Sequence, residues 1–206
     1  LVILACNTAS AKALRTIQQN DLPGIDPRRR VLGVIRPTVE NIGDVTLSRH
    51  IGVVGTPGTV QSHSYRLEVA KLFPDVTVNE QPCPLWVPLI ENGEATGDGA
   101  DYFVRKYLDL LLGADPKIDA IVLGCTHYPL LLPKIRKYLP DGVRIVAQAN
   151  IVADSLADYL RRHPEMDNAL SRDGSIEYLT TESTDKFDAL ASLFVGEPVA
   201  SKRILL

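Results

Sequence analysis

The sequence predicts an α/β fold with mostly parallel sheets, because short apolar strands alternate with helical segments along its 206 residues. Repeatedly, an apolar, β-branched run leads into a turn of small or hydroxylated residues and then into a helical pattern. The strongest strands are expected at 1–4, 51–54, 120–123 and 143–146. Strands that alternate with helices need crossover connections, so we expect sheets covered by helices on both faces.

The remaining elements follow from the same pattern. Each strong strand is followed by a helix, expected at 11–19, from the turn at 55–59 to 72, from the turn at 124–127 to 138, and at 151–162. Weaker strands are expected at 31–35, 76–79 and 176–180, and further helices at 99–112 and 185–193. Asp115-Pro116 and Pro140-Asp141-Gly142 indicate turns.

Composition excludes several classes of protein. The hydrophobic fraction of 45% and the charged fraction of 23% are those of a globular chain, not of a disordered or fibrous one. A net charge of −3 disfavours direct nucleic-acid binding. The three cysteines, an odd number, argue against a disulfide framework and favour the cytoplasm. We find no apolar run of about 18 residues, so we expect no membrane span.

Two stretches of the sequence resemble each other. VILACNTAS, near the start, and AIVLGCTHY, in the second half, each place a cysteine directly after a strand. The carboxyl ends of strands are where open α/β sheets bind ligands. We therefore expect two related half-structures, with Cys6 and Cys125 facing one cleft; chance similarity between two buried strands is the alternative.

Four chemistries are open to these thiols. Thiol–disulfide exchange is disfavoured because the chain has no Cys-x-x-Cys motif. A zinc site would have to combine both cysteines with Cys83 and His127, and no ligand-pair spacing supports a metal. A single nucleophile leaves the second cysteine unexplained. Two acid/base thiols on opposite faces of one carbon would use both, and this is cofactor-free racemisation. Cys83, flanked by prolines, is interpreted as structural.

The turns around the cysteines suit an acidic substrate. Helix N-termini stabilise a thiolate and favour carboxylates, so we expect lowered thiol pKa values and an anion site there. His127, two residues after Cys125, could exchange a proton in the site. Hydroxyl and amide groups for the substrate come from Asn7, Thr8, Thr56, Thr59 and Thr126. For Thr56 and Thr59, plain helix capping is the alternative. No Gly-x-Gly-x-x-Gly motif indicates a dinucleotide cofactor.

Four stretches of the sequence resemble those of a known protein family. ACNTAS, GVVGTPGTV, CPLWVPLIE and GCTHYPLL are similar to stretches of the glutamate racemases, within the aspartate/glutamate racemase superfamily. The resemblance covers essentially the whole chain. It implies cofactor-independent interconversion of L- and D-glutamate, which supplies D-glutamate for peptidoglycan and so for cell-wall biogenesis and cell shape.

The resemblance also implies roles for individual residues. Cys6 and Cys125 would be the catalytic thiols, and His127 would assist its neighbouring thiol. Glu91 is similar to a carboxylate that supports the histidine, although this match is looser. Asn7, Thr8 and Thr126 would line the substrate site, and Thr56 and Thr59 would contact a substrate carboxylate.

The family resemblance implies two pseudo-symmetric, doubly wound domains with the active site between them. The first domain would comprise 1–36 and 148–206, and the second 37–147. The family's Asp-Ser-Gly-x-Gly-Gly and Pro-Tyr-Gly segments are absent from this sequence, and Arg36 stands where the family commonly has an acidic residue. We therefore expect an N-terminally truncated chain. A homodimer is expected; the alternatives are a racemase for another acidic amino acid, such as aspartate, and a binding-only fragment.

Overall fold

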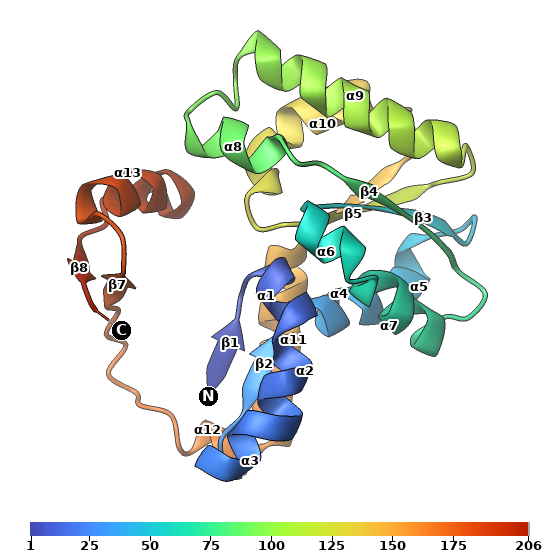
Figure 1. The fold of residues 1–206 in the computed structure, drawn as a ribbon. Coiled ribbons are helices and arrows are strands. Elements are labelled where there is room, and N and C mark those ends of the chain that lie inside the picture. Colours follow the sequence, from blue (N-terminus) through green and yellow to red (C-terminus); the bar gives the residue numbers. More distant parts are fainter. Residues whose placement is uncertain (206) are drawn as a thin grey trace. The chain divides into compact units, whose positions relative to one another are not determined.

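The computed structural model describes residues 1–205 and divides the chain into two compact units (Figure 1). The larger unit is Leu1–Asn168, and the smaller one begins at Ala169. Every strand pair in the described residues is parallel. Helices separate most of these strands along the chain. The predicted α/β class with mostly parallel sheets is therefore confirmed.

A four-stranded sheet forms the centre of the larger unit, in the order β4-β3-β5-β6. Its strands are β3 (His50–Gly55), β4 (Thr77–Pro82), β5 (Ala120–Gly124) and β6 (Arg144–Val146). Nearly every side chain of β3 and β5 is buried, as expected for parallel strands covered on both faces. Gly55 pairs with both Pro82 and Gly124, so three strands end level with one another.

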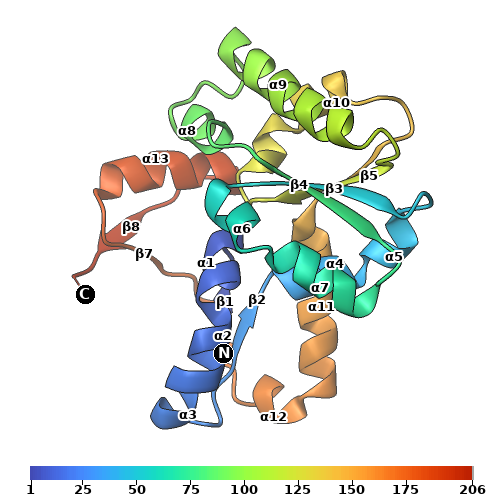
Figure 2. The same ribbon diagram turned by 45° about the vertical axis from the view of Figure 1, so that its right-hand side comes forward.

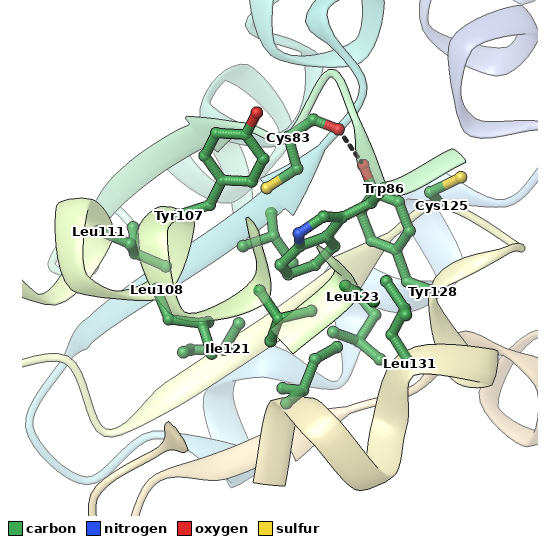
Figure 3. Packing of buried hydrophobic residues seen from close by; sticks show 14 of the residues in the cluster. Cys83, Trp86, Tyr107, Leu108, Leu111, Ile121, Leu123, Cys125, Tyr128 and Leu131 are labelled. Carbon is green, nitrogen blue, oxygen red and sulfur yellow. Dashed lines mark hydrogen bonds between the residues drawn. The ribbon is translucent and has the colours of Figure 1, made fainter. Parts of the chain in front are cut away.

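Helices cover both faces of this sheet. One face carries α8 (Trp86–Glu91), α9 (Asp98–Ala114) and α10 (Leu132–Tyr138), and the other carries α4 (Ile35–Glu40), α5 (Ile42–Val45) and α7 (Ser64–Leu72) (Figure 1). In the apolar core between the sheet and α8, α9 and α10, Trp86 and Tyr128 pack edge to face with ring centroids 4.7 Å apart. Figure 3 shows these rings beside Leu123 and Leu131.

A separate two-stranded sheet lies at the start of the chain. β1 (Val2–Leu4) pairs with β2 (Val31–Gly33), and between them run α1 (Asn7–Lys12), α2 (Leu14–Thr16), the π-helical turn η1 (Ile17–Asp21) and α3 (Leu22–Ile25). The larger unit ends with α11 (Gln148–Arg162) and α12 (Pro164–Asp167). Figure 2 shows α1 and α11 next to α4, and the contacts between these helices agree with that view.

The smaller unit contains β7 (Tyr178–Thr180), α13 (Thr184–Val195) and β8 (Ser201–Arg203). β7 and β8 are parallel, and α13 connects them. Gly196 ends the helix in the left-handed region, with φ at 82°, where glycine carries no Cβ penalty.

The structure differs from the predicted elements at several points. The strand expected at 31–35 stops at Gly33, because α4 begins at Ile35. The helix expected up to 72 is split into α6 (Pro57–Gln61) and α7, because His63 adopts a left-handed φ of 54°. The helix expected after 127 begins as a 3-10 turn, η2 (Tyr128–Leu131), before α10. Five helices and one strand were not predicted: α3, α4, α5, α8, α12 and β8. None of the described helices has the length and apolar character needed to cross a bilayer.

Candidate active site

The predicted site residues follow strands whose carboxyl ends lie at one edge of their sheets. Cys6 comes two residues after β1, and Thr56 and Cys125 come directly after β3 and β5. Helix α1, which begins after Cys6, contacts α6, which begins after Thr56. The fold thus places the segment that follows Cys6 against the turn that follows β3.

Three threonine hydroxyls meet where α1 and α6 touch. Thr8 Oγ1 lies 2.8 Å from Thr56 Oγ1 and 3.0 Å from Thr59 Oγ1, and the last two oxygens are 3.1 Å apart. A hydroxyl can rotate to donate or accept, so this triangle can turn its protons towards a carboxylate. Thr56 also caps α6 by accepting from the Thr59 main-chain N–H at 3.2 Å. Thr56 therefore both caps α6 and belongs to the hydroxyl cluster.

A thiol, an imidazole and a carboxylate form a chain of contacts after β5. Cys125 Sγ lies 3.8 Å from His127 Nδ1, and His127 Nε2 lies 3.1 Å from Glu91 Oε1. Glu91 is the last residue of α8. The arrangement can pass a proton between sulfur and imidazole while the carboxylate orients the ring. Thr126, between the thiol and the imidazole in sequence, is exposed.

The electrostatics of the two thiols differ. Cys6 is exposed at the N-terminus of α1, whereas Cys125 is 8% exposed. Burial raises the pKa of the Cys125 thiol to about 11, although the main-chain N–H groups of His127 and Tyr128 lower it. Negative charge on Cys6 and Glu91 raises it further. For Cys125 the expected lowering of the pKa is therefore wrong, because burial outweighs the turn that follows the sulfur.

Asn7 lies beside the first thiol but its side chain is fully buried, at 2% exposure. Its amide is bonded to Gln148 and Tyr65, and Gln148 is bonded in turn to Thr38. Sequence reasoning missed Gln148, Tyr65 and Thr38, because no local pattern links residues so far apart. Gln148 also precedes the helix expected at 151–162, so helix periodicity gave no signal for it.

Cys83 is 1% exposed and belongs to the apolar core above the sheet. Its Sγ donates to the Gln81 carbonyl at 3.6 Å, and the Tyr128 hydroxyl donates to its carbonyl at 3.4 Å (Figure 3). Burial raises the pKa of this thiol well above its ordinary value. The structural interpretation of Cys83 fits this environment. Within residues 1–205, no three His, Cys, Asp or Glu side chains come together as possible metal ligands.

Comparison with known proteins gives one family. The family model described as Asp/Glu/Hydantoin racemase matches residues 1–156. The glutamate racemase of Roseobacter denitrificans is 42% identical over 95% of this chain and 73% of that protein. The glutamate racemase of Ruegeria pomeroyi is 43% identical over 88% of this chain and 68% of that protein.

Solved structures give the same result. The glutamate racemase isoform RacE1 of Bacillus anthracis superimposes with a TM-score of 0.85 at 30% identity, over 99% of this chain and 73% of that one. The glutamate racemase of Francisella tularensis, solved in complex with D-glutamate, superimposes with a TM-score of 0.81 at 27% identity, over 99% of this chain and 72% of that one.

Proposed function

The chain belongs to the Asp/Glu/Hydantoin racemase family and is an amino-acid racemase, and on this premise we propose that it interconverts L- and D-glutamate without a cofactor. The proposal rests on one observation above all. The ends of β1 and β5 each carry a cysteine, and the second cysteine is in contact with a His127–Glu91 pair. Two thiols are what a proton exchange at opposite faces of one carbon requires.

In the proposed reaction, one cysteine thiolate removes the proton from the substrate Cα, and the bonding electrons stay on the carbon. The thiol of the other cysteine then donates its proton to the opposite face, which inverts the configuration. One thiolate is consumed and one is formed, so the enzyme ends ready for the other enantiomer. His127 Nδ1 is placed to take up or return the Cys125 proton, and Glu91 stabilises the imidazolium.

We assign substrate binding to the hydroxyl triangle and its neighbours. The hydroxyls of Thr8, Thr56 and Thr59 would donate to a substrate carboxylate, in exchange for the hydrogen bonds that they make to one another. Thr126 is exposed next to Cys125 and would contact the same ligand. The Asn7 side chain is bonded inside the protein, so its contribution would come through its main-chain N–H at the start of α1.

The domain division is likewise part of the proposal. The sheet of β1 and β2 lies within 1–36, and the four-stranded sheet lies within 37–147. This supports two α/β halves with one catalytic cysteine each. We assign 148–206 to the first half. A homodimer in the cytoplasm that supplies D-glutamate for peptidoglycan is proposed from the family resemblance alone.

The decisive experiment follows the Cα proton of glutamate in heavy water. We expect the protein to exchange this proton for deuterium, which NMR detects. We also expect the circular dichroism signal of D-glutamate to decay as the L-enantiomer forms. Cys6→Ser and Cys125→Ser should each abolish inversion, because each removes one of the two proton carriers. Cys83→Ser is the matched control. A single Cys6 or Cys125 variant that still racemises would overturn the two-thiol mechanism, and turnover of aspartate in place of glutamate would change the substrate.

A further inference from the structure

Asn7, Gln148 and Tyr65 form a closed ring of buried hydrogen bonds. Asn7 Nδ2 donates to Gln148 Oε1, Gln148 Nε2 donates to Tyr65 Oη, and Tyr65 Oη donates to Asn7 Oδ1, each at 2.7 Å. The three residues are 2%, 8% and 0% exposed. The ring couples the orientations of the two amides, because turning over one amide alone would place two donors or two acceptors opposite each other.

A branch ties this ring to a fourth helix. Gln148 Nε2 also donates to Thr38 Oγ1 at 2.7 Å, and the Thr38 hydroxyl donates to the Val34 carbonyl at 2.8 Å. Because the Thr38 hydroxyl donates to Val34, it can only accept from Gln148, and this selects the orientation of the Gln148 amide. Gln148 Nε2 also lies 3.3 Å from Asn7 Oδ1. Buried polar networks in which every member is bonded are rigid, and removing one partner leaves the others unsatisfied at a high cost.

The ring adjoins both segments that carry the thiols. Asn7 directly follows Cys6 in sequence. At the other end, the Tyr65 ring packs against the residue that precedes Cys125: a Cβ added to Gly124 would lie only 3.2 Å from Tyr65 Cε2. One hydrogen-bonded unit is therefore in contact with both cysteine segments.

The ring residues also come from different parts of the chain. Asn7 and Gln148 belong to α1 and α11, whereas Tyr65 belongs to α7, which packs on the four-stranded sheet. In the proposed domain division, Asn7 and Gln148 stand on one side of the boundary and Tyr65 stands on the other. A movement of one half against the other would have to break this ring.

We propose that Gln148 and Tyr65 are positioning residues that fix the separation between the Cys6 and Cys125 thiols. This inference rests on the proposed two-thiol reaction. Racemisation needs both sulfurs within reach of one Cα, on opposite faces. A displacement of about 1 Å at a reacting group can cost about 100-fold in rate.

Two variants break the ring and one spares it. Tyr65→Phe removes only the hydroxyl and keeps the packing against Gly124, and Gln148→Met removes the amide at similar volume. Thr46→Val is the control, because it removes a buried hydroxyl that is bonded to Asp119 and belongs neither to the ring nor to its branch. We expect kcat for glutamate to fall about tenfold in each ring variant, with KM changed less than about threefold.

The double variant tests whether the ring acts as a unit. Once one bond of the ring is broken, the second substitution removes little more, so Tyr65→Phe with Gln148→Met should lose no more than the worse single variant. We expect Thr46→Val to keep kcat within about threefold of the parent. Losses that multiply in the double variant, or an equal loss in Thr46→Val, would show that the ring contributes only to general stability and would overturn the proposal.

A measurement without turnover separates this proposal from the proposed function. A short dihaloalkane can alkylate both thiols and join Cys6 to Cys125, which peptide mass mapping detects. We expect the yield of the bridged peptide, relative to single alkylation, to fall in both ring variants and to stay unchanged in Thr46→Val. Cys83, 1% exposed, should stay unlabelled, which shows that each variant is folded. An unchanged bridging yield in folded ring variants would overturn the proposal, whether or not the protein racemises glutamate.

Discussion

At the scale of single residues, burial decides the protonation of Cys125. The side chain is 8% exposed, and its pKa of about 11 keeps the sulfur protonated at neutral pH. A protonated Cys125 is suited to donate a proton, and its conversion to a thiolate needs an acceptor in contact with it. His127 Nδ1, at 3.8 Å, is the acceptor that the structure provides.

The raised pKa predicts how Cys125 reacts with an alkylating agent. Because only the thiolate is nucleophilic, its alkylation by iodoacetamide should accelerate with pH up to about 11. The rate is measured by peptide mass mapping across a pH series, with Cys83 as the buried reference thiol. A rate that levels off below pH 9 would show that burial does not govern this sulfur.

Glu91→Gln tests the chain of contacts behind Cys125. The neutral amide can still accept a hydrogen bond from His127 but lacks the negative charge that stabilises an imidazolium, so we expect kcat to fall about tenfold. The same change removes a negative charge that raises the pKa of Cys125, so the alkylation profile should move to lower pH. Glu94→Gln, an exposed change in the loop after α8, is the control. Loss of activity without the shift in the profile would contradict the electrostatic role of Glu91.

At the scale of elements, the close approach of α1 and α6 builds the substrate end of the site. Gly58, in the first turn of α6, makes this approach possible, because a Cβ there would lie 2.9 Å from Thr8 Cγ2. Any larger residue must push Thr8 away from Thr56 and Thr59. The hydroxyl triangle therefore depends on a glycine that makes no polar contact through a side chain.

Gly58→Ala should weaken substrate binding. We expect KM for glutamate to rise several-fold, about 3- to 10-fold, as Thr8 moves out of the triangle. Helix propensity favours alanine over glycine by about 1 kcal/mol, so the variant should remain folded. Gly99→Ala in α9 is the matched control, since nothing lies within 4 Å of its added Cβ. A steady-state assay decides the matter: unchanged KM in Gly58→Ala would mean that the triangle does not bind the substrate.

At the scale of the whole molecule, features set by neighbouring residues could be predicted from the sequence, whereas contacts between residues far apart in the chain could not. Seven of the eight strands follow from short apolar runs, and the segments around Cys6 and Cys125 were recognised from strand ends. Gln148 was not recognised, because it is 141 residues from its partner Asn7 and its role exists only in the folded chain. The division of the helix at His63 was missed too, because nothing in the sequence marks a left-handed histidine.

At the end of the central sheet opposite the site, one carboxylate connects a loop to β5. Asp119, just before β5, accepts hydrogen bonds from the Thr46 hydroxyl and from the main-chain N–H groups of Leu47 and Ser48, the latter two at 2.7 Å. Burial alone would raise the pKa of this carboxyl, but the hydrogen bonds outweigh it and lower the pKa to about 2. The carboxylate thus joins the loop before β3 to β5, far from the site edge.

The lowered pKa of Asp119 makes global stability depend on acid. The charged carboxylate stabilises the fold fully above the ordinary pKa of 3.8, and this contribution is lost as pH falls from there towards 2. Asp119→Asn should therefore lower the free energy of unfolding at pH 7 by about 1–2 kcal/mol and reduce its decline between pH 4 and about 2. Urea unfolding across this pH range measures both effects, with Asp109→Asn on the exposed face of α9 as the control. A variant that loses stability equally at pH 7 and pH 2 would show that the hydrogen-bonding geometry of Asp119, and not its charge, stabilises the sheet.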